Sequence, residues 1–419
     1  MTTPTPLTTT TIETPATPEP GHAGQTFLVG DEIYIRRIEK RDARFAMSWR
    51  NEIFPRSPAV TEEWIAKEMM KSGRDWYAIV RKGDDRVVGS ITLAGHGIHT
   101  FLQFTTDPLF GDAGRWKAEA IRLVIPWRSD EQKRISQFFS LTGDETDAIA
   151  AALATGAFEA TRTPALILKD GAWVDLVRFA HLSPAWIAKL GDPRETDLVR
   201  TGTGEPRPVP AKGTWEGAPP QGAILVGQRV YLKAVDNEDA AAMARFGRRE
   251  TETDYGHFRA VNNPENHAHR RLEDNTQRLR GNIGFAVRLR ENDHFIGEVA
   301  VLDVDYVNQY GETASWMYDP AFRGSGYGSE AKHLLLEYCF DVLGLRAVES
   351  FVSTDNPRSA AALRKQGYRE AGVLPWTSLK NGRFSGNTVF HLTAEAWRAL
   401  PHATSSTHGH DHGHESEAV

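Results

Sequence analysis

The sequence predicts a mixed α/β fold that occurs twice in one chain. Three observations lead to this prediction. A strand-like run, a glycine-dense loop and a helix-like run follow one another near residue 325, further strand-like runs surround them, and a similar order of segments appears earlier in the chain. Strands are indicated by alternating apolar residues and helices by apolar residues three or four positions apart.

The glycine-dense loop is the most informative segment. An alternating run from Ala314 to Tyr318 precedes it, and Asp319-Pro320 ends that run. Glycines let the backbone approach a ligand closely, and the N–H groups at a helix N-terminus face an anion. The loop therefore predicts a phosphate site made of Arg323, Gly324, Ser325, Gly326, Tyr327 and Gly328. The helix that follows has apolar residues at Ala331, Leu334, Leu335, Tyr338, Cys339 and Val342.

Two common phosphate loops are excluded by details of this segment. No Lys-Ser/Thr pair follows the last glycine, so the loop is not a Walker A motif. The spacing of Gly324, Gly326 and Gly328 is G-x-G-x-G, which differs from the dinucleotide fingerprint. An ordinary glycine turn at a helix N-terminus is the alternative.

The loop and its surroundings resemble GNAT-type N-acetyltransferases. Arg-x-x-Gly-x-Gly after a strand and a proline resembles that family's acyl-CoA pyrophosphate loop. A strand at Val348 to Val352, then Asn356-Pro-Arg-Ser359, a helix from Ala360 to Lys365 and Gly367-Tyr368 resemble the RimJ/RimL-like branch. The resemblance runs from about Val226 to Leu400. It implies a mostly antiparallel central sheet, flanked by helices and splayed where acetyl-CoA binds.

Composition narrows the class of protein. The chain has 419 residues, of which 40% are hydrophobic, so it can form more than one globular domain. A formal net charge of −6 argues against a nucleic-acid surface. The one cysteine, Cys339, excludes an intramolecular disulfide, and its apolar helix face predicts a buried structural thiol. No apolar run is long enough for a membrane span and no secretory signal is evident, so we expect a cytoplasmic protein.

An internal repeat relates the two halves. The run that begins Val29-Gly-Asp-Glu-Ile-Tyr34 matches the run that begins Val226-Gly-Gln-Arg-Val-Tyr231. Further matches at a nearly constant spacing pair Gly89 with Gly297, Asp107-Pro with Asp319-Pro, and Trp186 with Trp397. The chain is therefore predicted to be a tandem of two copies of one fold, which could form an intramolecular pseudo-dimer.

The copies differ where the resemblance places the chemistry. With Asp107 set against Asp319, Arg323 becomes Gly111, Gly324 becomes Asp112 and Gly328 becomes Trp116. An aspartate repels a pyrophosphate, and an indole fills space that the ligand needs. Glu145-Thr-Asp-Ala148 replaces Asn356-Pro-Arg-Ser359. The N-terminal copy is therefore predicted to be degenerate, and a copy that is active through a different loop is the alternative.

Five segments follow from these features. Residues 1–25 are predicted to be a disordered Thr/Pro-rich terminus and residues 26–190 the degenerate copy. Residues 191–224 read as an extended linker, residues 225–400 as the active copy and residues 401–419 as a disordered tail. The tail carries His402, His408, His410, His412 and His414. Alternating His and Gly could bind Zn²⁺ or Ni²⁺, with a solvated tail of adventitious metal affinity as the alternative, and we assign no metal site.

The resemblance implies direct transfer of an acetyl group from acetyl-CoA, as cosubstrate, to an amine. By this resemblance, main-chain groups of Met317 and Tyr318 should pair with the pantetheine amides. The glycine loop should bind the pyrophosphate, and Asn356 should contact the pantetheine arm. Glu312, on the same strand, is the expected base, and Thr100 is its expected counterpart in the degenerate copy. The alternative for Glu312 is a surface glutamate.

The donor for the leaving thiolate is less well marked. Many members of the family carry a tyrosine where this chain has Leu363. Ser359 is therefore the expected proton donor to the thiolate. Its alternative role is that of N-cap of the following helix. Tyr368 is expected in the core.

The acceptor is expected to be a primary amine, either of a small molecule or of a protein N-terminus. Acidic and aromatic residues between Glu250 and Phe258 would suit a cationic amine, or form a solvated loop. The rival function is a non-catalytic acyl-CoA sensor or scaffold whose N-terminal copy binds other proteins.

Overall fold

A computed structural model describes most of the chain between residues 27 and 403. The described ranges are 27–50, 54–95, 99–196, 205–249, 265, 269, 272–273, 281–380 and 382–403. The predicted Thr/Pro-rich terminus, the acidic segment Glu250 to Phe258 and the tail histidines from His408 onward lie outside these residues.

Contacts divide the chain into two compact units. Unit 1 contains residues 1–158 and 179–186, and unit 2 contains residues 159–178 and 187–419. The division does not follow sequence order, because a segment from the N-terminal half, residues 159–178, is packed within unit 2.

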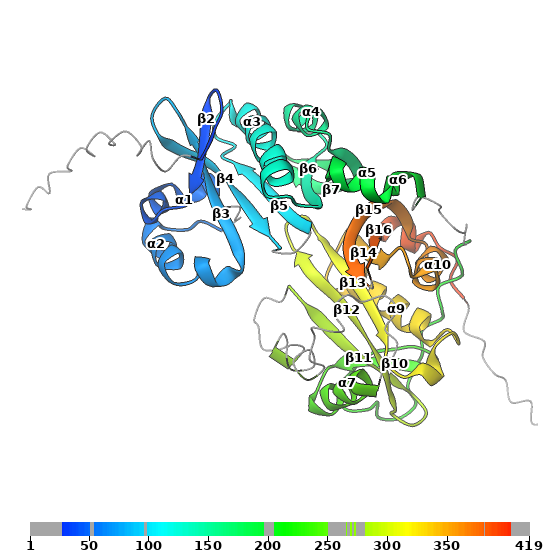
Figure 1. Ribbon diagram of the computed structural model, residues 1–419. Coiled ribbons are helices and arrows are strands. Elements are labelled where there is room, and N and C mark those ends of the chain that lie inside the picture. Colours follow the sequence, from blue (N-terminus) through cyan, green and yellow to red (C-terminus); the bar gives the residue numbers. More distant parts are fainter. Residues whose placement is uncertain are drawn as a thin grey trace, which may run out of the picture. The chain divides into compact units, whose positions relative to one another are not determined.

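The strands of unit 1 form a sheet, and its helices occur between these strands in the sequence. Its strand order is β1-β2-β3-β4-β5-β6, and β5 and β6 run parallel while the other registered pairs run antiparallel. The strands are β1 (Leu28–Val29), β2 (Ile33–Arg37), β3 (Arg74–Arg81), β4 (Arg86–Ala94), β5 (His99–Thr106) and β6 (Ser136–Thr142). The α-helices are α1 (Ala46–Trp49), α2 (Pro58–Lys67), α3 (Ala113–Pro126) and α4 (Thr146–Ala154), labelled with strands β2 to β6 in Figure 1.

Unit 2 repeats this succession of elements. Its strand order is β8-β7-β15-β16-β14-β13-β12-β11-β10-β9. Its strands are β7 (Phe158–Lys169), β8 (Ala172–Leu182, shared with unit 1), β9 (Ala223–Val226), β10 (Val230–Ala234), β11 (Ile283–Leu289), β12 (Phe295–Asp305), β13 (Tyr310–Met317), β14 (Ala347–Ser353), β15 (Arg369–Lys380) and β16 (Arg383–Thr393). Its helices include α7 (Asn237–Arg249), α9 (Tyr327–Glu337), α10 (Pro357–Lys365) and α11 (Ala394–Arg398), while α5 (Pro184–Leu190) and α6 (Pro193–Thr196) follow β8.

The parallel pair β13–β14 of unit 2 separates soon after it forms. Its ladder joins Tyr310–Glu312 to Ala347–Glu349 and then ends. Beyond that point β13 stays paired with β12 as far as Met317, and β14 stays paired with β16 as far as Ser353. The predicted mixed α/β fold, with a mostly antiparallel sheet splayed between two strands, is confirmed.

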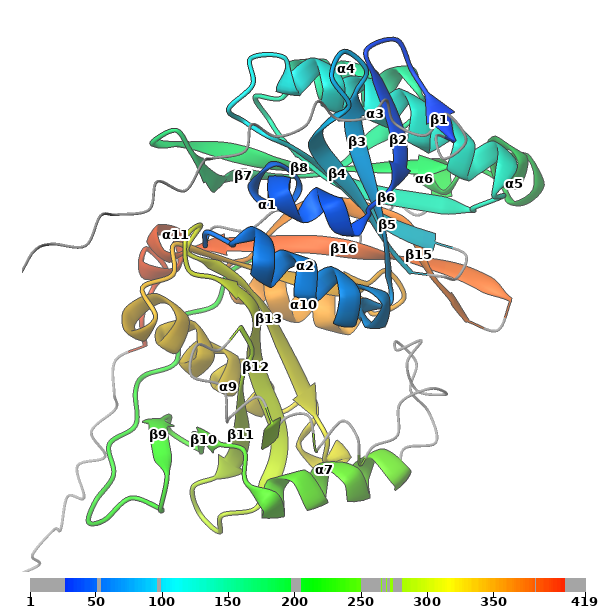
Figure 2. The same cartoon turned by 90° about the vertical axis from the view of Figure 1, so that its left-hand side faces the viewer.

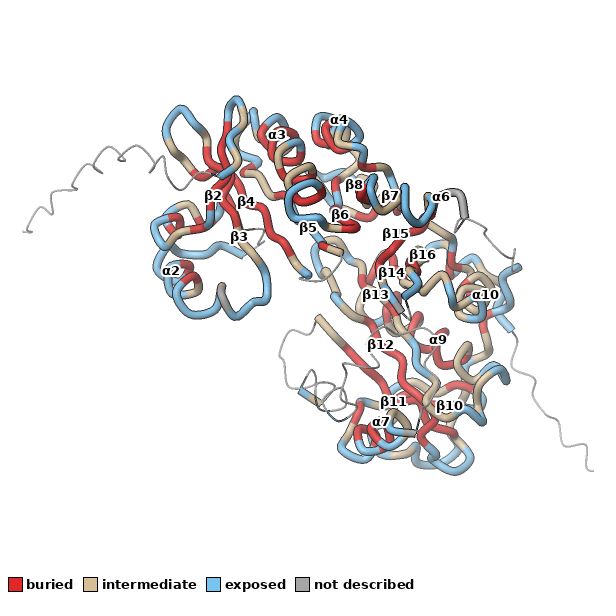
Figure 3. Tube along the Cα trace, viewed as in Figure 1, coloured by how far each residue is buried: buried red, intermediate tan, exposed pale blue. Residues whose placement is uncertain are grey.

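Helices cover both faces of the unit 2 sheet. Successive residues of a strand point to opposite faces. Val287 packs in the cluster that contains Leu335 of α9, whereas Ala286 packs in the cluster that contains Met243 of α7. Figure 2 shows both helices beside the strands, and Figure 3 shows the buried residues concentrated along the strands.

The helix after the glycine loop has the predicted apolar face with one exception. Ala331, Leu335 and Cys339 are fully buried, and burial raises the pKa of the Cys339 thiol to about 12, consistent with a structural role. Val342 was predicted on this face but is 62% exposed. The chain forms a π-turn over Tyr338–Val342, which changes the helical period and rotates Val342 outward.

The described part of the predicted linker is extended and packs on unit 2. Val209 is buried in the core of this unit, and its N–H donates to the carbonyl of Pro401 at 2.7 Å. The Arg207 N–H donates to the carbonyl of Lys365 at 2.7 Å. These bonds tie the segment to the end of α10 and to the chain after α11.

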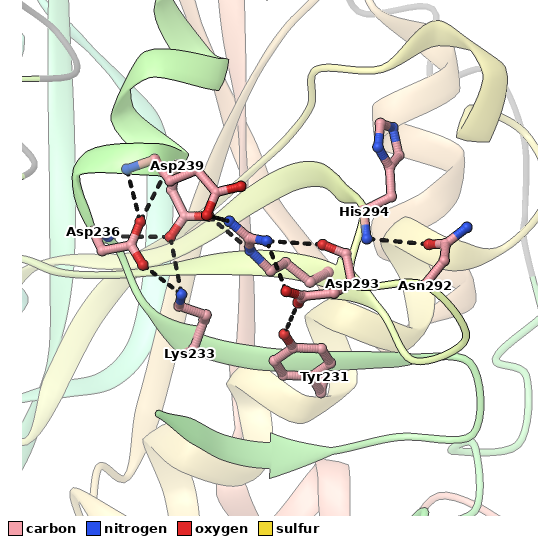
Figure 4. A network of polar contacts seen from close by, with 9 residues as sticks. Tyr231, Lys233, Asp236, Asp239, Asn292, Asp293 and His294 are labelled. Atoms are coloured by element: carbon pink, nitrogen blue, oxygen red, sulfur yellow. Dashed lines mark hydrogen bonds and ion pairs between the residues drawn. The ribbon is translucent and has the colours of Figure 1, made fainter. Parts of the chain in front are cut away.

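A buried charge network joins β10, α7 and the β11–β12 turn (Figure 4). Arg288 is 2% exposed, and its guanidinium pairs with Asp239 at 2.7 Å and with Asp293 at 3.2 Å. The hydroxyl of Tyr231 donates to Asp293, and Lys233 pairs with Asp236 at 2.5 Å. Since Asp239 is fully buried, Arg288 supplies the positive charge that makes its burial tolerable.

We predict that Arg288→Met destabilises unit 2 by about 3–5 kcal/mol, because the substitution leaves the buried Asp239 carboxylate without its partner. The control is Arg248→Met, which removes an exposed pair with Glu265 and should cost less than about 1 kcal/mol. Urea unfolding followed by fluorescence measures both variants, and equal losses would contradict the assigned role.

Candidate active site

The glycine loop lies between β13 and α9, as the sequence predicts. Strand β13 ends at Met317, and the carboxylate of Asp319 accepts the N–H of Ala321 at 3.0 Å, which caps a single 3-10 turn over Pro320–Phe322. The loop follows, and α9 begins at Tyr327. The first N–H groups of a helix have no partner within the helix, so they face the loop as donors.

The loop requires glycine at three positions, two because of the backbone conformation and one because of close packing. Gly324 and Gly326 have φ of +83° and +87°, values that side chains other than glycine rarely adopt. Gly328 has an ordinary conformation, but a Cβ there would lie 3.1 Å from Met317 Cγ, inside normal contact distance. The loop therefore depends on glycine both for its backbone path and for its approach to the end of β13.

Arg229 holds the loop from the start of β10. Its Nη1 donates to the carbonyl of Ser325 at 3.0 Å, its Nε donates to Glu330 at 2.9 Å, and its guanidinium lies 4.3 Å from the Tyr327 ring centroid. Glu330 is 3% exposed and also accepts the Arg229 N–H at 2.8 Å. Sequence reasoning missed Arg229, because nothing in its local sequence marks a contact with a loop about a hundred residues away.

Arg323 contacts the strand end rather than open solvent. Its Nε donates to the carbonyl of Met317 at 2.8 Å, and its Nη2 donates to the carbonyl of Tyr318 at 3.3 Å. The structure thus brings together three residues that the sequence assigned to the acyl-CoA site. In this arrangement, the Arg323 guanidinium satisfies carbonyls at the C-terminal end of β13, beyond the point where β13 and β14 separate.

Glu312 lies at the last rung of the parallel ladder. It is half-buried on β13 and in register with Glu349 on β14. Burial raises the pKa of the Glu312 carboxyl to about 7, and the charges of Asp303 and Glu349 act in the same direction against those of Lys332 and Arg178. A carboxyl that titrates near neutral pH can accept a proton from an amine.

The segment after β14 places Asn356 and Ser359 at the start of α10. Asn356 is the N-cap, and its side-chain oxygen accepts the Ser359 N–H at 3.1 Å. The alternative that Ser359 is the N-cap is therefore wrong, because Ser359 lies inside the first turn. Ser359 is half-buried.

Tyr368 lies in the core, as the sequence predicts. It is 4% exposed, and its hydroxyl is 2.8 Å from Thr313 Oγ1. Burial raises the pKa of this phenol far above its usual range, so it holds its proton. Leu363, which stands where many relatives have a tyrosine, is also buried.

Unit 1 lacks the glycine loop of unit 2. Glu119 accepts the Glu32 N–H at 3.1 Å in unit 1, just as Glu330 accepts the Arg229 N–H in unit 2. If Glu119 and Glu330 are taken as equivalent residues, Trp116 is equivalent to Tyr327. The predicted equivalence of Trp116 with Gly328 is therefore wrong by one residue. Helix α3 already begins at Ala113, so the residues that match Gly324–Gly326 are helical in unit 1.

The counterpart of Glu312 also shifts by one residue. Gly89 faces Thr106 in unit 1, whereas its repeat partner Gly297 faces Met317 in unit 2. Counting back from these two pairs makes Phe101, not Thr100, the residue of unit 1 that is equivalent to Glu312. Thr100 is fully buried and its hydroxyl accepts from Arg128 at 2.6 Å. Neither Phe101 nor Thr100 has a carboxylate. With either residue as the counterpart of Glu312, unit 1 has no carboxylate base at this position.

Comparisons with known proteins agree with the geometry of unit 2. Residues 229–369 match the family model described as acetyltransferase (GNAT) domain. An uncharacterized N-acetyltransferase of Bacillus subtilis, YnaD, is 26% identical over 113 residues, which is 27% of this chain. The chain matches 65% of that relative's length.

Solved structures with similarity to parts of the chain include two that are described as acetyltransferases. A putative acetyltransferase from Sphaerobacter thermophilus is 29% identical, with 37% of this chain and 96% of that chain covered and a TM-score of 0.32. Spermidine N-acetyltransferase SpeG from Vibrio cholerae, in complex with CoA and spermine, is 19% identical, with 40% and 98% covered and a TM-score of 0.34.

Residues 229–369 of this chain are therefore similar to GNAT acetyltransferase domains, and the proteins that the chain resembles include an N-acetyltransferase. The matched residues span the loop, Glu312 and the start of α10. Within the described parts of the chain, no helix is long and apolar enough to cross a membrane.

We predict that Gly326→Ala weakens acetyl-CoA binding at least about tenfold, because a Cβ is strained at this φ and approaches Arg229 Nη2 to 3.3 Å. The matched control is Gly344→Ala, which has φ of +68° but no atom within 4 Å of the added Cβ. Calorimetric titration with acetyl-CoA measures both variants. Equal affinity in the two variants would show that the loop does not hold the ligand.

Proposed function

We propose that unit 2 transfers an acetyl group from acetyl-CoA to a primary amine, of a small molecule or of a protein N-terminus. Residues 225–400 are the active copy in this proposal, and residues 26–190 are a degenerate copy without acetyl-CoA binding. The observation that carries the proposal is the divergence of β13 from β14 beside Glu312, on a strand that leads into the glycine loop.

The residues at this site fit an acyl-CoA. The positive φ of Gly324 and Gly326 and the N-terminus of α9 form a cradle for a pyrophosphate, with donors also from Ser325, Tyr327 and Gly328. Beyond the ladder, β14 no longer pairs with the edge of β13, and the carbonyls of Met317 and Tyr318 accept from Arg323, whereas the Tyr318 N–H donates to the carbonyl of Ile296 on β12 at 3.0 Å. Pantetheine amides can pair with that edge when Arg323 releases its carbonyls, and the guanidinium is then available for the phosphates.

Acetyl-CoA supplies an acetyl group on a thioester. In the proposed step the amine nitrogen bonds to the acetyl carbon as the carbon–sulfur bond breaks, one amine proton passes to Glu312, and the sulfur takes up a proton. Glu312 is suited to this role because its raised pKa lets it be ionised yet basic near neutral pH.

Ser359 is the proposed donor toward the sulfur. Its N–H is held by Asn356, which fixes the first turn of α10 next to the strand end of β14. Tyr368 is set aside for this role because its hydroxyl is bonded to Thr313 in the core. We assign Asn356 to the pantetheine arm.

We predict that Glu312→Gln lowers the rate of acetyl transfer by about 10²–10⁴-fold while acetyl-CoA still binds, because the amide cannot accept a proton. Glu337→Gln, which removes a surface pair with Lys212, is the control and should keep full activity. The assay follows thiol release with DTNB over a panel of spermidine, an aminoglycoside and a peptide with a free N-terminus.

The pH dependence provides a second readout. Because the pKa of Glu312 is raised to about 7 and the base must be ionised, the rate should rise with pH through about 7. Binding of acetyl-CoA without thiol release by any amine would favour the sensor or scaffold over the enzyme.

A further inference from the structure

A hairpin from the N-terminal half is built into unit 2. Residues 159–178, from β7 and β8, belong to this unit by their contacts. Leu166 and Leu176 pack with Ala347 of β14 and Tyr310 of β13 in one apolar cluster. The guanidinium of Arg346 lies 3.6 Å from the Trp173 ring centroid. The hairpin is therefore packed against the beginning of the parallel ladder that ends at Glu312.

Two hairpin side chains hold a buried carboxylate of β14. Arg178 donates to both oxygens of Glu349, at 3.0 Å and 2.5 Å. Thr163, fully buried, donates its hydroxyl proton to Glu349 at 2.6 Å. Glu349 is 2% exposed, so its charge depends on these partners rather than on water.

Glu349 is the neighbour of the proposed base. The ladder pairs Glu349 directly with Glu312, and side chains opposite one another in a ladder point to the same face. Arg178 of β8 thus pairs with Glu349 of β14, and Glu349 is in register with Glu312 of β13; this series of three residues is called the row below, although β8 and β14 are not neighbours in the sheet. The Arg178 charge offsets part of the repulsion that Glu349 exerts on ionised Glu312, whereas an unpaired Glu349 would repel the ionised base more strongly.

We propose that Arg178 is a positioning residue that balances the charge of Glu349, and so sets the pH at which Glu312 ionises. The role in catalysis rests on the proposed function, but the electrostatic coupling does not. The charges predict that loss of Arg178 and loss of the Glu349 charge shift the pKa of Glu312 in opposite directions. Removing Arg178 leaves two adjacent carboxylates that resist joint ionisation, and removing the Glu349 charge leaves a cation that favours ionised Glu312.

Other ionisable groups surround this row and are unchanged in the test. They come from β12, β13, α9, β15 and β16, and they are Asp303, Tyr310, Lys332, Arg369 and His391.

The test is a carbon-13 NMR titration of the full chain labelled at glutamate Cδ, without ligand, in which Glu312→Gln identifies the Glu312 signal. We expect Arg178→Met to raise the last ionisation of the carboxylate pair by about one pH unit or more, and Glu349→Gln to lower the Glu312 midpoint by a similar amount. The double variant should return close to the starting value. Arg178→Lys, which keeps the charge, should shift the midpoint less than Arg178→Met.

The control is Arg162→Met on the same hairpin, because Arg162 pairs with Glu159 and Asp175 and not with Glu349. It should leave the Glu312 midpoint unchanged. Shifts of the same sign in both single variants, or none in either, would overturn the proposal and leave Arg178 as a packing residue. If Arg178→Met fails to fold, Glu349→Gln and Arg178→Lys still decide the sign. A titration as predicted together with no acetyl transfer would reject the proposed function alone.

Discussion

The candidate site depends on the early end of the parallel ladder between β13 and β14. Strands that separate inside a protein expose main-chain N–H and C=O groups that must find other partners. At this point Thr313 Oγ1 donates to the carbonyl of Glu349 at 3.0 Å, and the Ser350 hydroxyl donates to the carbonyl of Thr313. Further along, Arg323 covers the carbonyls of Met317 and Tyr318. Side chains therefore satisfy an edge that a ligand with amide groups can also satisfy.

The same geometry explains why charged groups gather at this point. Glu312 and Glu349 are the last registered pair, so two carboxylates face the same side in a poorly solvated place. One of them is neutralised by Arg178 and the other has a pKa near 7. Separate ionisation of neighbouring carboxylates is a common way to obtain a base at neutral pH. Here the cation that pairs with Glu349 comes from a hairpin encoded in the N-terminal half of the chain, and we propose that this gives the hairpin a role in the chemistry of unit 2.

Local sequence patterns predicted much of the fold, and long-range contacts account for what they missed. The glycine loop, the helix after it and the buried Cys339 follow from spacing and residue type, because those features are set within a few residues. Trp116 and Thr100 were aligned one residue off, since a repeat match cannot detect a helix that starts earlier or a different ladder register. Arg229 and Arg178 were not found, because each acts on a partner far along the chain. Val342 was misplaced by a π-turn that an ideal helical period does not include.

We propose that this chain has one acetyl-CoA site, in unit 2, and none in unit 1. Calorimetric titration of the full chain with acetyl-CoA measures the number of sites directly. The account predicts one site per chain, which Gly326→Ala weakens. Two sites per chain, or a single site unaffected by changes in the Arg323–Gly328 loop, would contradict it.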